Sequence, residues 1–231
     1  GTREYIEGTT DFAVQIGLSI DGVPVRCSDV AATARLVRDP SSKRPQAAPV
    51  EPRRFRIDPY PSERERYGTL RALSVDPGGA ERVLGELKAS GLKGLGGAGF
   101  PTAAKWELVQ KEAAAPKYVV CNADESEPGT FKDRVLLEEA PHLVVEGIAI
   151  AARTVGAREA IVFIRHEYGR EREALAREID RARGANALGG LELDVFVSPG
   201  GYILGEETAL LESLEDRRGE PRNKPPFPGT V

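Results

Sequence analysis

One apolar run sets the fold class of this chain: Glu159-Ala160-Ile161-Val162-Phe163-Ile164-Arg165. A short continuous apolar run bounded by polar residues is typical of a buried strand. A helical pattern lies on either side of it, apolar over residues 141–155 and charged over residues 168–184. We expect the charged helix to be largely solvated. A strand between two helices indicates an α/β domain.

Two more strands and three more helices extend this pattern. Residues 117–122 and 191–197 predict buried strands, and helices are predicted over about residues 78–92, 101–114 and 205–217. Helices that alternate with strands serve as crossovers between parallel strands. The sequence therefore predicts an α/β fold with a mostly parallel sheet.

The first third of the chain has a different composition. Residues 12–20 alternate between apolar and polar side chains and lead to the turn signal Asp21-Gly22, which predicts a β-hairpin. Six prolines stand among arginines in residues 39–62, as in an extended linker. We predict a hairpin and a linker or docking arm over residues 1–75, and the α/β domain over residues 76–231. A redox domain is the alternative for the first part, but no cysteine cluster follows the hairpin.

Composition argues against several functional classes. The 231 residues carry a net charge of −4, which gives no reason to expect a nucleic-acid partner. No apolar run approaches the ~18 residues of a membrane span, so we expect no direct membrane insertion. Cys27 and Cys121 are isolated, which predicts no metal site in this chain and a reducing, cytoplasmic location, free or on the cytoplasmic side of a membrane complex. The absence of methionine and the end at Val231 lead us to expect a piece of a longer polypeptide.

A glycine run precedes the second of these helices: Gly94-Leu95-Gly96-Gly97-Ala98-Gly99-Phe100-Pro101-Thr102, with Lys105 just after it. Backbone without side chains can approach a flat or charged ligand, and its N–H groups can converge on phosphate. The helix N-terminus that follows favours the same negative charge. A tight turn between two elements explains the glycines equally well, so the run alone leaves both interpretations open.

Acidic loops follow two of the predicted strands. Residues 122–127 hold an Asn, an Asp and two Glu, and the loop after the third strand leads into Gly205-Glu206-Glu207. Ligands of open α/β sheets bind at the carboxyl ends of the strands, where these groups would accept hydrogen bonds from ribityl or ribose hydroxyls. Their charge would repel phosphate, which assigns phosphate to the glycine run and Lys105. Ordinary helix N-terminal charges are the alternative for the Glu206-Glu207 pair.

Together these motifs, in this order, are specific. They are the glycine run, Lys105-Trp106, Cys121-Asn-Ala-Asp-Glu-Ser-Glu-Pro-Gly-Thr130, Tyr202-Ile-Leu-Gly-Glu-Glu-Thr-Ala-Leu210 and Lys224-Pro-Pro-Phe-Pro228. Over about residues 80–231 the chain resembles the flavin-binding subunit of respiratory complex I. The same module occurs in NAD-linked formate dehydrogenases and in NAD-reducing hydrogenases. The resemblance implies a Rossmann-like fold with non-covalent FMN, on whose ring NAD(H) stacks.

The resemblance also implies roles for residues by their motif positions. The flavin would be held by Gly94, Gly96, Gly97 and Lys105. Its ribityl and phosphate portion would be bound by Asn122, Asp124 and Glu125. Near its reactive edge would lie Gly205, Glu206 and Glu207, and Glu207 would tune the reaction. NAD(H) would be faced by Phe100, Glu127, Lys224 and Phe227. The chain departs from the family at Leu108, where an aromatic residue is common, and at Leu204, where a Cys is common.

The activity that the resemblance implies is hydride transfer between NAD(H) and FMN, with single electrons exchanged with iron–sulfur clusters. The partners would be iron–sulfur subunits of a larger redox complex, and the family's [4Fe–4S] motif would lie beyond Val231. Two other classes stay open. One is a flavin-free scaffolding subunit, and the other is a phosphoryl transferase, against which the lack of a Gly-Lys-Ser/Thr P-loop argues.

Overall fold

The computed structural model describes residues 19–20, 23–24, 58–94 and 99–228. The chain divides into two compact units, Gly1–Arg56 and Ile57–Val231. In the first unit, strand β1 (Ser19–Ile20) pairs antiparallel with β2 (Val23–Pro24), and Ile20 lies opposite Val23. This pairing confirms the tip of the predicted hairpin; the rest of that hairpin lies outside the described residues.

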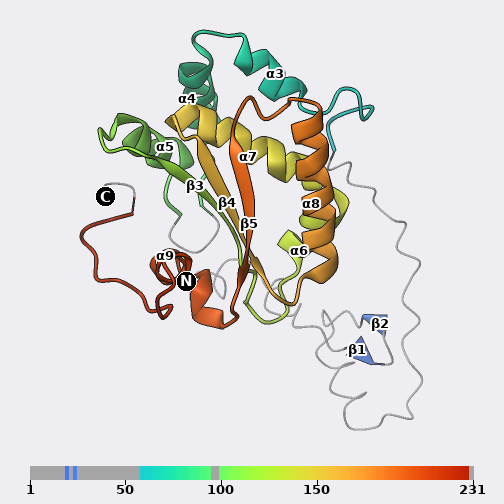
Figure 1. Cartoon of the computed structure of the whole chain (residues 1–231), viewed down its shortest axis with the longest axis vertical. Helices are drawn as coiled ribbons and strands as arrows, with labels where there is room; N and C mark the ends of the chain where they lie inside the picture. Colours follow the sequence, from blue (N-terminus) through green and yellow to red (C-terminus); the bar gives the residue numbers. More distant parts are fainter. Residues whose placement is uncertain (1–18, 21–22, 25–57, 95–98, 229–231) are drawn as a thin grey trace, which may run out of the picture. The chain divides into compact units, whose positions relative to one another are not determined.

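A three-stranded sheet forms the centre of the second unit (Figure 1). Its strands are β3 (Tyr118–Ala123), β4 (Glu159–Arg165) and β5 (Glu192–Ser198), in that spatial order and all parallel. The predicted α/β class and parallel sheet are therefore confirmed. Because the strands are parallel, all three carboxyl ends lie at one edge of the sheet, which we call the carboxyl edge.

Seven α-helices and one 3₁₀-helix surround the sheet in the described part of this unit. They are α3 (Gly68–Ser74), α4 (Gly79–Ser90), α5 (Thr102–Lys111), α6 (Lys132–Glu139), α7 (Pro141–Val155), α8 (Gly169–Gly184), η1 (Tyr202–Gly205) and α9 (Glu207–Leu214). The sequence analysis missed α3 and α6, which are only 7 and 8 residues long. It also did not predict η1, and it gave α9 the bounds 205–217.

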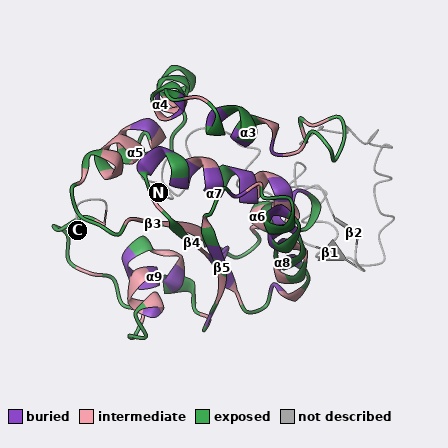
Figure 2. Ribbon diagram, turned by 45° about the horizontal axis from the view of Figure 1, so that its top comes forward, coloured by how far each residue is buried: buried purple, intermediate pink, exposed green. Residues whose placement is uncertain are grey.

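The main core lies between the sheet and helices α7 and α8 (Figure 2). Val162 and Ile164 of β4 pack there with Val145 of α7 and Leu175 of α8, and all four are fully buried. Helix α8 also buries Ile179 on the same face. The prediction that this charged helix is largely solvated was wrong for that face. The short apolar stripe of α8 was not recognised in the sequence, because arginines and glutamates surround it.

The opposite face of the sheet carries η1 and α9. Phe163 is fully buried there with Leu204 of η1 and Leu210 of α9. The Phe163 ring stacks on the Phe196 ring with centroids 5.4 Å apart. This packing fixes the N-terminus of α9 beside the carboxyl edge, because η1 and α9 follow directly from the end of β5.

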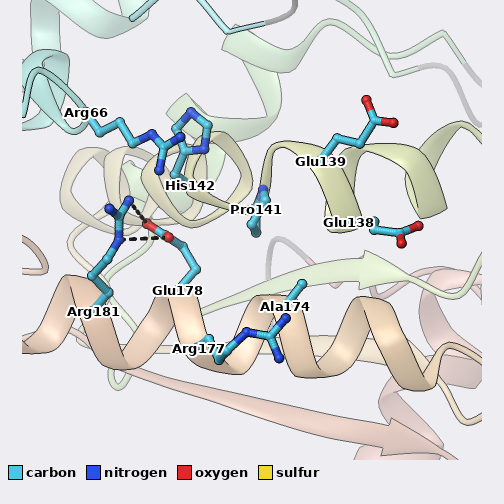
Figure 3. Close-up of a pocket in the computed structure, with 9 residues that line it drawn as sticks. All are labelled: Arg66, Glu138, Glu139, Pro141, His142, Ala174, Arg177, Glu178 and Arg181. Carbon is cyan, nitrogen blue, oxygen red and sulfur yellow. Dashed lines mark hydrogen bonds and ion pairs between the residues drawn. The ribbon is translucent and has the colours of Figure 1, made fainter. Parts of the chain in front are cut away.

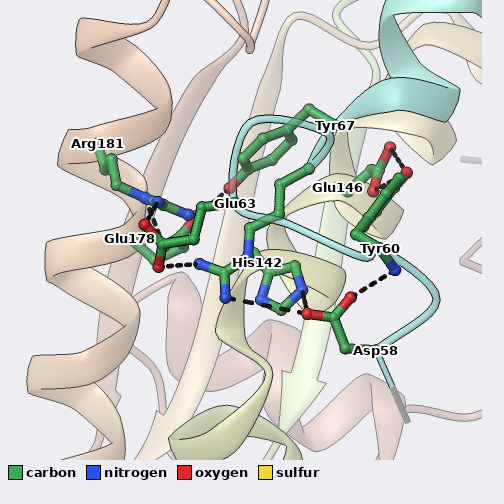
Figure 4. A network of polar contacts seen from close by, with 9 residues as sticks. Asp58, Tyr60, Glu63, Tyr67, His142, Glu146, Glu178 and Arg181 are labelled. Carbon is green, nitrogen blue, oxygen red and sulfur yellow. Dashed lines mark hydrogen bonds and ion pairs between the residues drawn. The ribbon is translucent and has the colours of Figure 1, made fainter. Parts of the chain in front are cut away.

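The segment before α4 packs on α7 and α8 through buried polar contacts (Figure 4). The Tyr60 hydroxyl lies 2.8 and 2.9 Å from the two carboxylate oxygens of Glu146, which also accepts a hydrogen bond from the Leu70 backbone N–H. The Tyr67 hydroxyl donates to Glu178 over 2.5 Å. The second compact unit therefore includes residues 58–75, which the sequence analysis grouped with the arm.

Candidate functional site at the carboxyl edge

Asn122 ties the end of β3 to the start of α9. Its side-chain amide donates to the Gly205 carbonyl over 2.9 Å, and its side-chain oxygen accepts from the Asp124 N–H. A Cβ at Gly205 would lie 3.4 Å from the Asp124 carbonyl oxygen, so the two loops approach closely. The structure thus brings together the two acidic loops that the sequence analysis predicted at one edge.

Asp124 ties the end of β3 to the end of β5. Its buried carboxylate accepts hydrogen bonds from Ser198, the last residue of β5, and from Ser126 in its own loop. The Ser198 hydroxyl lies 3.0 Å from the carboxylate and also accepts the Gly200 N–H. The sequence analysis did not assign Ser198 to the site. Its position at the end of the third strand was the available signal.

Two lysines from distant segments converge on the Glu206-Glu207 pair. Lys224 Nζ lies 3.1 Å from Glu206 Oε1 and 2.7 Å from Glu207 Oε1. Lys105 Nζ, from the first turn of α5, lies 3.6 Å from Glu207 Oε2. We call Lys105, Glu206, Glu207 and Lys224 the Glu–Lys cluster. The cluster brings together three residues that were predicted to lie at the flavin and one, Lys224, that was predicted to face NAD(H).

The cluster holds both carboxylates in their ionised form. Burial alone would raise the pKa of Glu206, but hydrogen bonds from Thr208, Ala209 and Lys224 lower it to about 2. The hydrogen bond from Lys224 lowers the pKa of Glu207 against partial burial, and the charge of Lys105 adds to this. The same contacts raise the pKa of Lys224. Near neutral pH the cluster is therefore two anions beside two cations.

The helix N-termini at this edge differ in how their N–H groups are used. At α9, the Glu206 carboxylate accepts the N–H groups of Thr208 and Ala209, each over 2.9 Å. At α5, Pro101 is the N-cap, and no side chain caps the helix among the described residues. No acidic residue stands in the first turn of α5, where Lys105 is placed. The start of α5 is therefore the terminus that suits an anion.

The residues on either side of positions 95–98 pair with each other. Lys93 and Pro101 form an isolated antiparallel bridge, and the Gly94 N–H donates to the Phe100 carbonyl over 2.9 Å. Gly99 has a φ of 61°, a conformation that favours glycine. Gly96 and Gly97 lie outside the described residues. The base of the loop leads directly into α5, as the sequence analysis expected.

Exposed aromatic side chains accompany the cluster. Phe100 at the base of the glycine loop is 49% exposed, and Phe227, three residues after Lys224, is 56% exposed. Glu127 accepts a 2.5 Å hydrogen bond from the hydroxyl of Tyr202, which is itself 65% exposed. The sequence analysis quoted Tyr202 within a motif and gave it no role. The contact with Glu127 links the loop after β3 to η1.

Glu125 is engaged elsewhere. Its buried carboxylate accepts the N–H groups of Asp133 and Arg134 at the start of α6, over 2.9 and 3.1 Å. It also accepts the Tyr168 hydroxyl over 3.0 Å. Burial and this hydrogen bond raise the pKa of Tyr168 to about 12. Glu125 thus caps a helix, whereas Asn122 and Asp124 bind within the carboxyl edge.

A pocket of about 290 Å³ lies elsewhere, beside α6, α7 and α8 (Figure 3). Arg66, His142 and Glu178 are among its lining residues, and none of the predicted site residues is. His142 is buried, with Nε2 3.0 Å from the Asp58 carboxylate. Within the described ranges, no cluster of side chains suits a metal ion, and no helix has the length and apolarity to cross a membrane. The pocket is thus separate from the chemistry-bearing groups.

Comparisons with known proteins identify relatives of this chain. The F subunit of NADH-quinone oxidoreductase in Aquifex aeolicus is 45% identical over 186 residues, 77% of this chain and 43% of that protein. One of the corresponding F subunits in Rhizobium meliloti is 50% identical over 161 residues, 66% of this chain and 37% of that protein. A crystal structure of an NAD⁺-reducing [NiFe]-hydrogenase in the H₂-reduced state matches with a TM-score of 0.65 and 41% identity. The match covers 71% of this chain and 28% of the hydrogenase chain.

The matched part of the chain is the part that builds the carboxyl edge. This chain spans about two fifths of the length of the curated relatives. The family model of the Nuo51 FMN-binding domain matches residues 87–231, which include the glycine run, both acidic loops and Lys224. The chain belongs to the Nuo51 FMN-binding domain family.

Proposed function

We propose that this chain is the FMN- and NAD(H)-binding part of an NADH dehydrogenase, or diaphorase, module. One observation carries the proposal. The start of α5, which no side chain caps and whose Thr102 N–H donates to the Leu92 carbonyl, follows the glycine run and places Lys105 within 3.6 Å of Glu207, at the edge where the acidic loops converge. A site for phosphate thus adjoins a site for hydroxyl groups. The relatives, which are F subunits of NADH-quinone oxidoreductases, support the assignment.

The chemistry of the residues fits FMN. A flavin nucleotide has a phosphate, a ribityl chain and a flat ring system. The start of α5 and the exposed ammonium of Lys105 suit the phosphate. Asn122 and Asp124 offer polar atoms to hydroxyl groups. Gly94 leaves room at the backbone: among the described residues, a Cβ there would have only the Phe100 carbonyl oxygen within 4 Å.

Each residue of the cluster then has a distinct task. When bound, FMN supplies the capacity to accept a hydride and to pass on single electrons. Lys105 and the α5 N–H groups orient the phosphate, together with Gly96 and Gly97 of the glycine run. Glu206 fixes the start of α9, which in turn fixes the backbone of Gly205. Glu207, 45% exposed and ionised, sets the charge at the reactive edge without moving a proton.

The dinucleotide would bind over the exposed side of the cluster. Phe100 and Phe227 offer aromatic faces for stacking. Lys224 is the cation placed for the pyrophosphate, since it is already held beside the Glu pair by two hydrogen bonds. Glu127 and its partner Tyr202 border the same region. Glu125 contributes indirectly. Its hydrogen bonds to the start of α6 fix the segment after β3, which runs from Asn122 at the end of the strand to Glu127.

The wider setting is part of the proposal. The partners are iron–sulfur subunits of a multisubunit redox complex on the cytoplasmic side, and a [4Fe–4S] site belongs to a part of the family beyond this sequence. Residues 1–56, the first compact unit and the larger part of the predicted arm, serve as the docking arm. The relatives' names, a quinone oxidoreductase subunit and an NAD⁺-reducing hydrogenase, support this setting. A flavin-free scaffold is the competing function.

Flavin titration tests the proposal against the scaffold. The chain should bind FMN with an absorption band near that of other flavoproteins, and Lys105→Gln should raise the FMN Kd about tenfold through loss of one charge-assisted contact. Lys111→Gln, at the other end of α5, is the matched control and should leave the Kd unchanged. A folded chain that stays colourless at millimolar FMN would exclude the flavin function.

A further inference from the structure

The segment that follows α9, residues 217–228, lies against α9 and η1, and we call it the post-α9 segment. The Arg217 N–H donates to the Glu212 carbonyl over 2.9 Å. A Cβ at Gly219 would clash with Cδ2 of Leu204, which is buried. The backbone therefore approaches η1 so closely at residue 219 that only glycine fits without a shift. The segment is anchored before it reaches Lys224.

Arg222 is the second anchor. Its backbone N–H donates to Thr208 Oγ1 over 2.9 Å. Its guanidinium pairs with two carboxylates of α9's C-terminal part: Nε with Glu212, and Nη2 with Glu215 over 2.7 Å. These contacts raise the pKa of Arg222 and lower that of Glu215. A forked guanidinium between two acceptors fixes direction as well as distance.

Thr208 connects this anchor to the Glu–Lys cluster. It is 1% exposed, and its hydroxyl donates to Glu206 Oε2 over 2.5 Å while it accepts the Arg222 N–H. Lys224 follows two residues later, within about 7 Å of chain. The ammonium of Lys224 reaches both Glu206 and Glu207 from there. One buried hydroxyl thus bonds both the post-α9 segment and the carboxylate that Lys224 meets.

We propose that Arg222 is a positioning residue for the dinucleotide: its clamp on Glu212 and Glu215 holds Lys224 at the carboxyl edge and fixes the segment that leads to Phe227. The inference rests on the proposed function, in which these two residues meet NAD(H). Arg222 itself points along α9 and bonds to residues outside the cluster. It acts through Lys224, so its removal and that of Lys224 should affect the same step.

A double-mutant cycle on the FMN-loaded chain tests this coupling. We expect Arg222→Gln to raise the Kd for NADH about fivefold and Lys224→Gln to raise it about tenfold, both with unchanged FMN affinity. The double variant should be no weaker than Lys224→Gln alone. Arg218→Gln is the matched control, since Arg218 is 88% exposed and pairs with Glu220. Its Kd should equal that of the native chain.

Hydrogen exchange without any ligand gives an independent measure. The amide N–H of residue 222 should exchange about tenfold faster in Arg222→Gln than in the native chain or in Arg218→Gln, because the clamp keeps it on Thr208. Unchanged exchange, unchanged NADH affinity in Arg222→Gln, or multiplied effects in the double variant would each overturn the inference. A native FMN-loaded chain that binds no NADH would overturn the proposed function and, with it, this inference.

Discussion

The molecule uses glutamates in two regions that differ in how deeply the carboxylates are buried. Beside α7 and α8, the carboxylates of Glu125, Glu146 and Glu178 are buried and accept hydrogen bonds from backbone N–H groups and tyrosine hydroxyls, and Glu178 also accepts two from Arg181 of its own helix. At the carboxyl edge, Glu206 and Glu207 are half-buried or exposed and meet lysines from two distant segments. The first group fixes elements of the fold, and the second lies where a ligand can reach it.

This difference indicates which carboxylates can exchange one hydrogen-bond or ion-pair partner for another. A buried carboxylate that loses a donor, or a buried donor that loses its carboxylate, incurs the full cost of desolvation. A lysine at an exposed cluster can turn to a phosphate while water and the second lysine satisfy the glutamate. The edge region is therefore suited to binding and release, and the buried region is not. Five variants test this contrast.

Glu146→Ala should have the largest effect. It leaves the N–H of buried Leu70 without its acceptor and removes the carboxylate that the Tyr60 hydroxyl contacts. We expect a loss of about 3 kcal/mol in the free energy of unfolding, measured by denaturant titration. Glu138→Ala, at an exposed position of α6, is the control and should change stability by less than about 0.5 kcal/mol. Equal stability of the two variants would contradict the structural role of Glu146.

Glu207→Gln should show the opposite pattern. The exposed side chain keeps its shape, so the free energy of unfolding should stay within about 0.5 kcal/mol of the native value. Loss of the charge beside Lys105 and Lys224 should change NADH oxidation about tenfold in kcat/KM, with little change in FMN affinity. Steady-state kinetics measures the change in NADH oxidation, and flavin titration measures FMN affinity. A parallel loss of FMN and of stability would make Glu207 a structural residue.

Glu206 lies between these extremes, because it both caps α9 and meets Lys224. Its pKa in the folded chain is about 2, below the ordinary glutamate value of 4.5. Its contribution to stability is therefore complete above about pH 4.5 and is lost as the pH falls toward 2. Because the side chain is 32% exposed, we expect only about 1 kcal/mol. Glu206→Gln should flatten the fall in stability between pH 4.5 and 2; an unchanged slope would exclude this role.

Local patterns made the sheet and the main helices predictable. β4 and α7 have the same bounds in the sequence analysis and in the structure, because an uninterrupted apolar run and an apolar stripe with Pro141 at its start are short-range signals. Helix α6 was missed because its eight residues are mostly charged. Its start depends on Glu125, which caps it from the loop between β3 and α6.

The partners of the site residues were less predictable than the residues themselves. The motifs pointed to Glu206, Glu207 and Lys224, and the structure brings these three together. Nothing local in the sequence shows that Thr208 bonds Arg222, 14 residues later, or that Glu125 turns toward Tyr168, 43 residues later. These contacts depend on how α9 and α8 pack against the sheet. Long-range polar contacts of this kind emerge only with the fold.

The smallest expected effect is that of Tyr202→Phe. Its comparison with Tyr67→Phe tests the contrast between buried and exposed glutamates most directly, because both variants remove the same kind of hydrogen bond. Tyr67–Glu178 and Tyr202–Glu127 are both hydroxyl–carboxylate hydrogen bonds of 2.5 Å. Tyr67 is 5% exposed and Tyr202 is 65% exposed. Tyr202→Phe should cost less than about 0.5 kcal/mol in the free energy of unfolding and raise the NADH Kd less than threefold, because water replaces the lost partner. Tyr67→Phe should cost about 2 kcal/mol, because buried Glu178 keeps its contacts with Arg181 but loses a donor that water cannot replace. If denaturant titration gave both variants the same loss, burial would not be what separates the two groups of glutamates, and the assignment of the edge group to ligand binding would lose its physical basis.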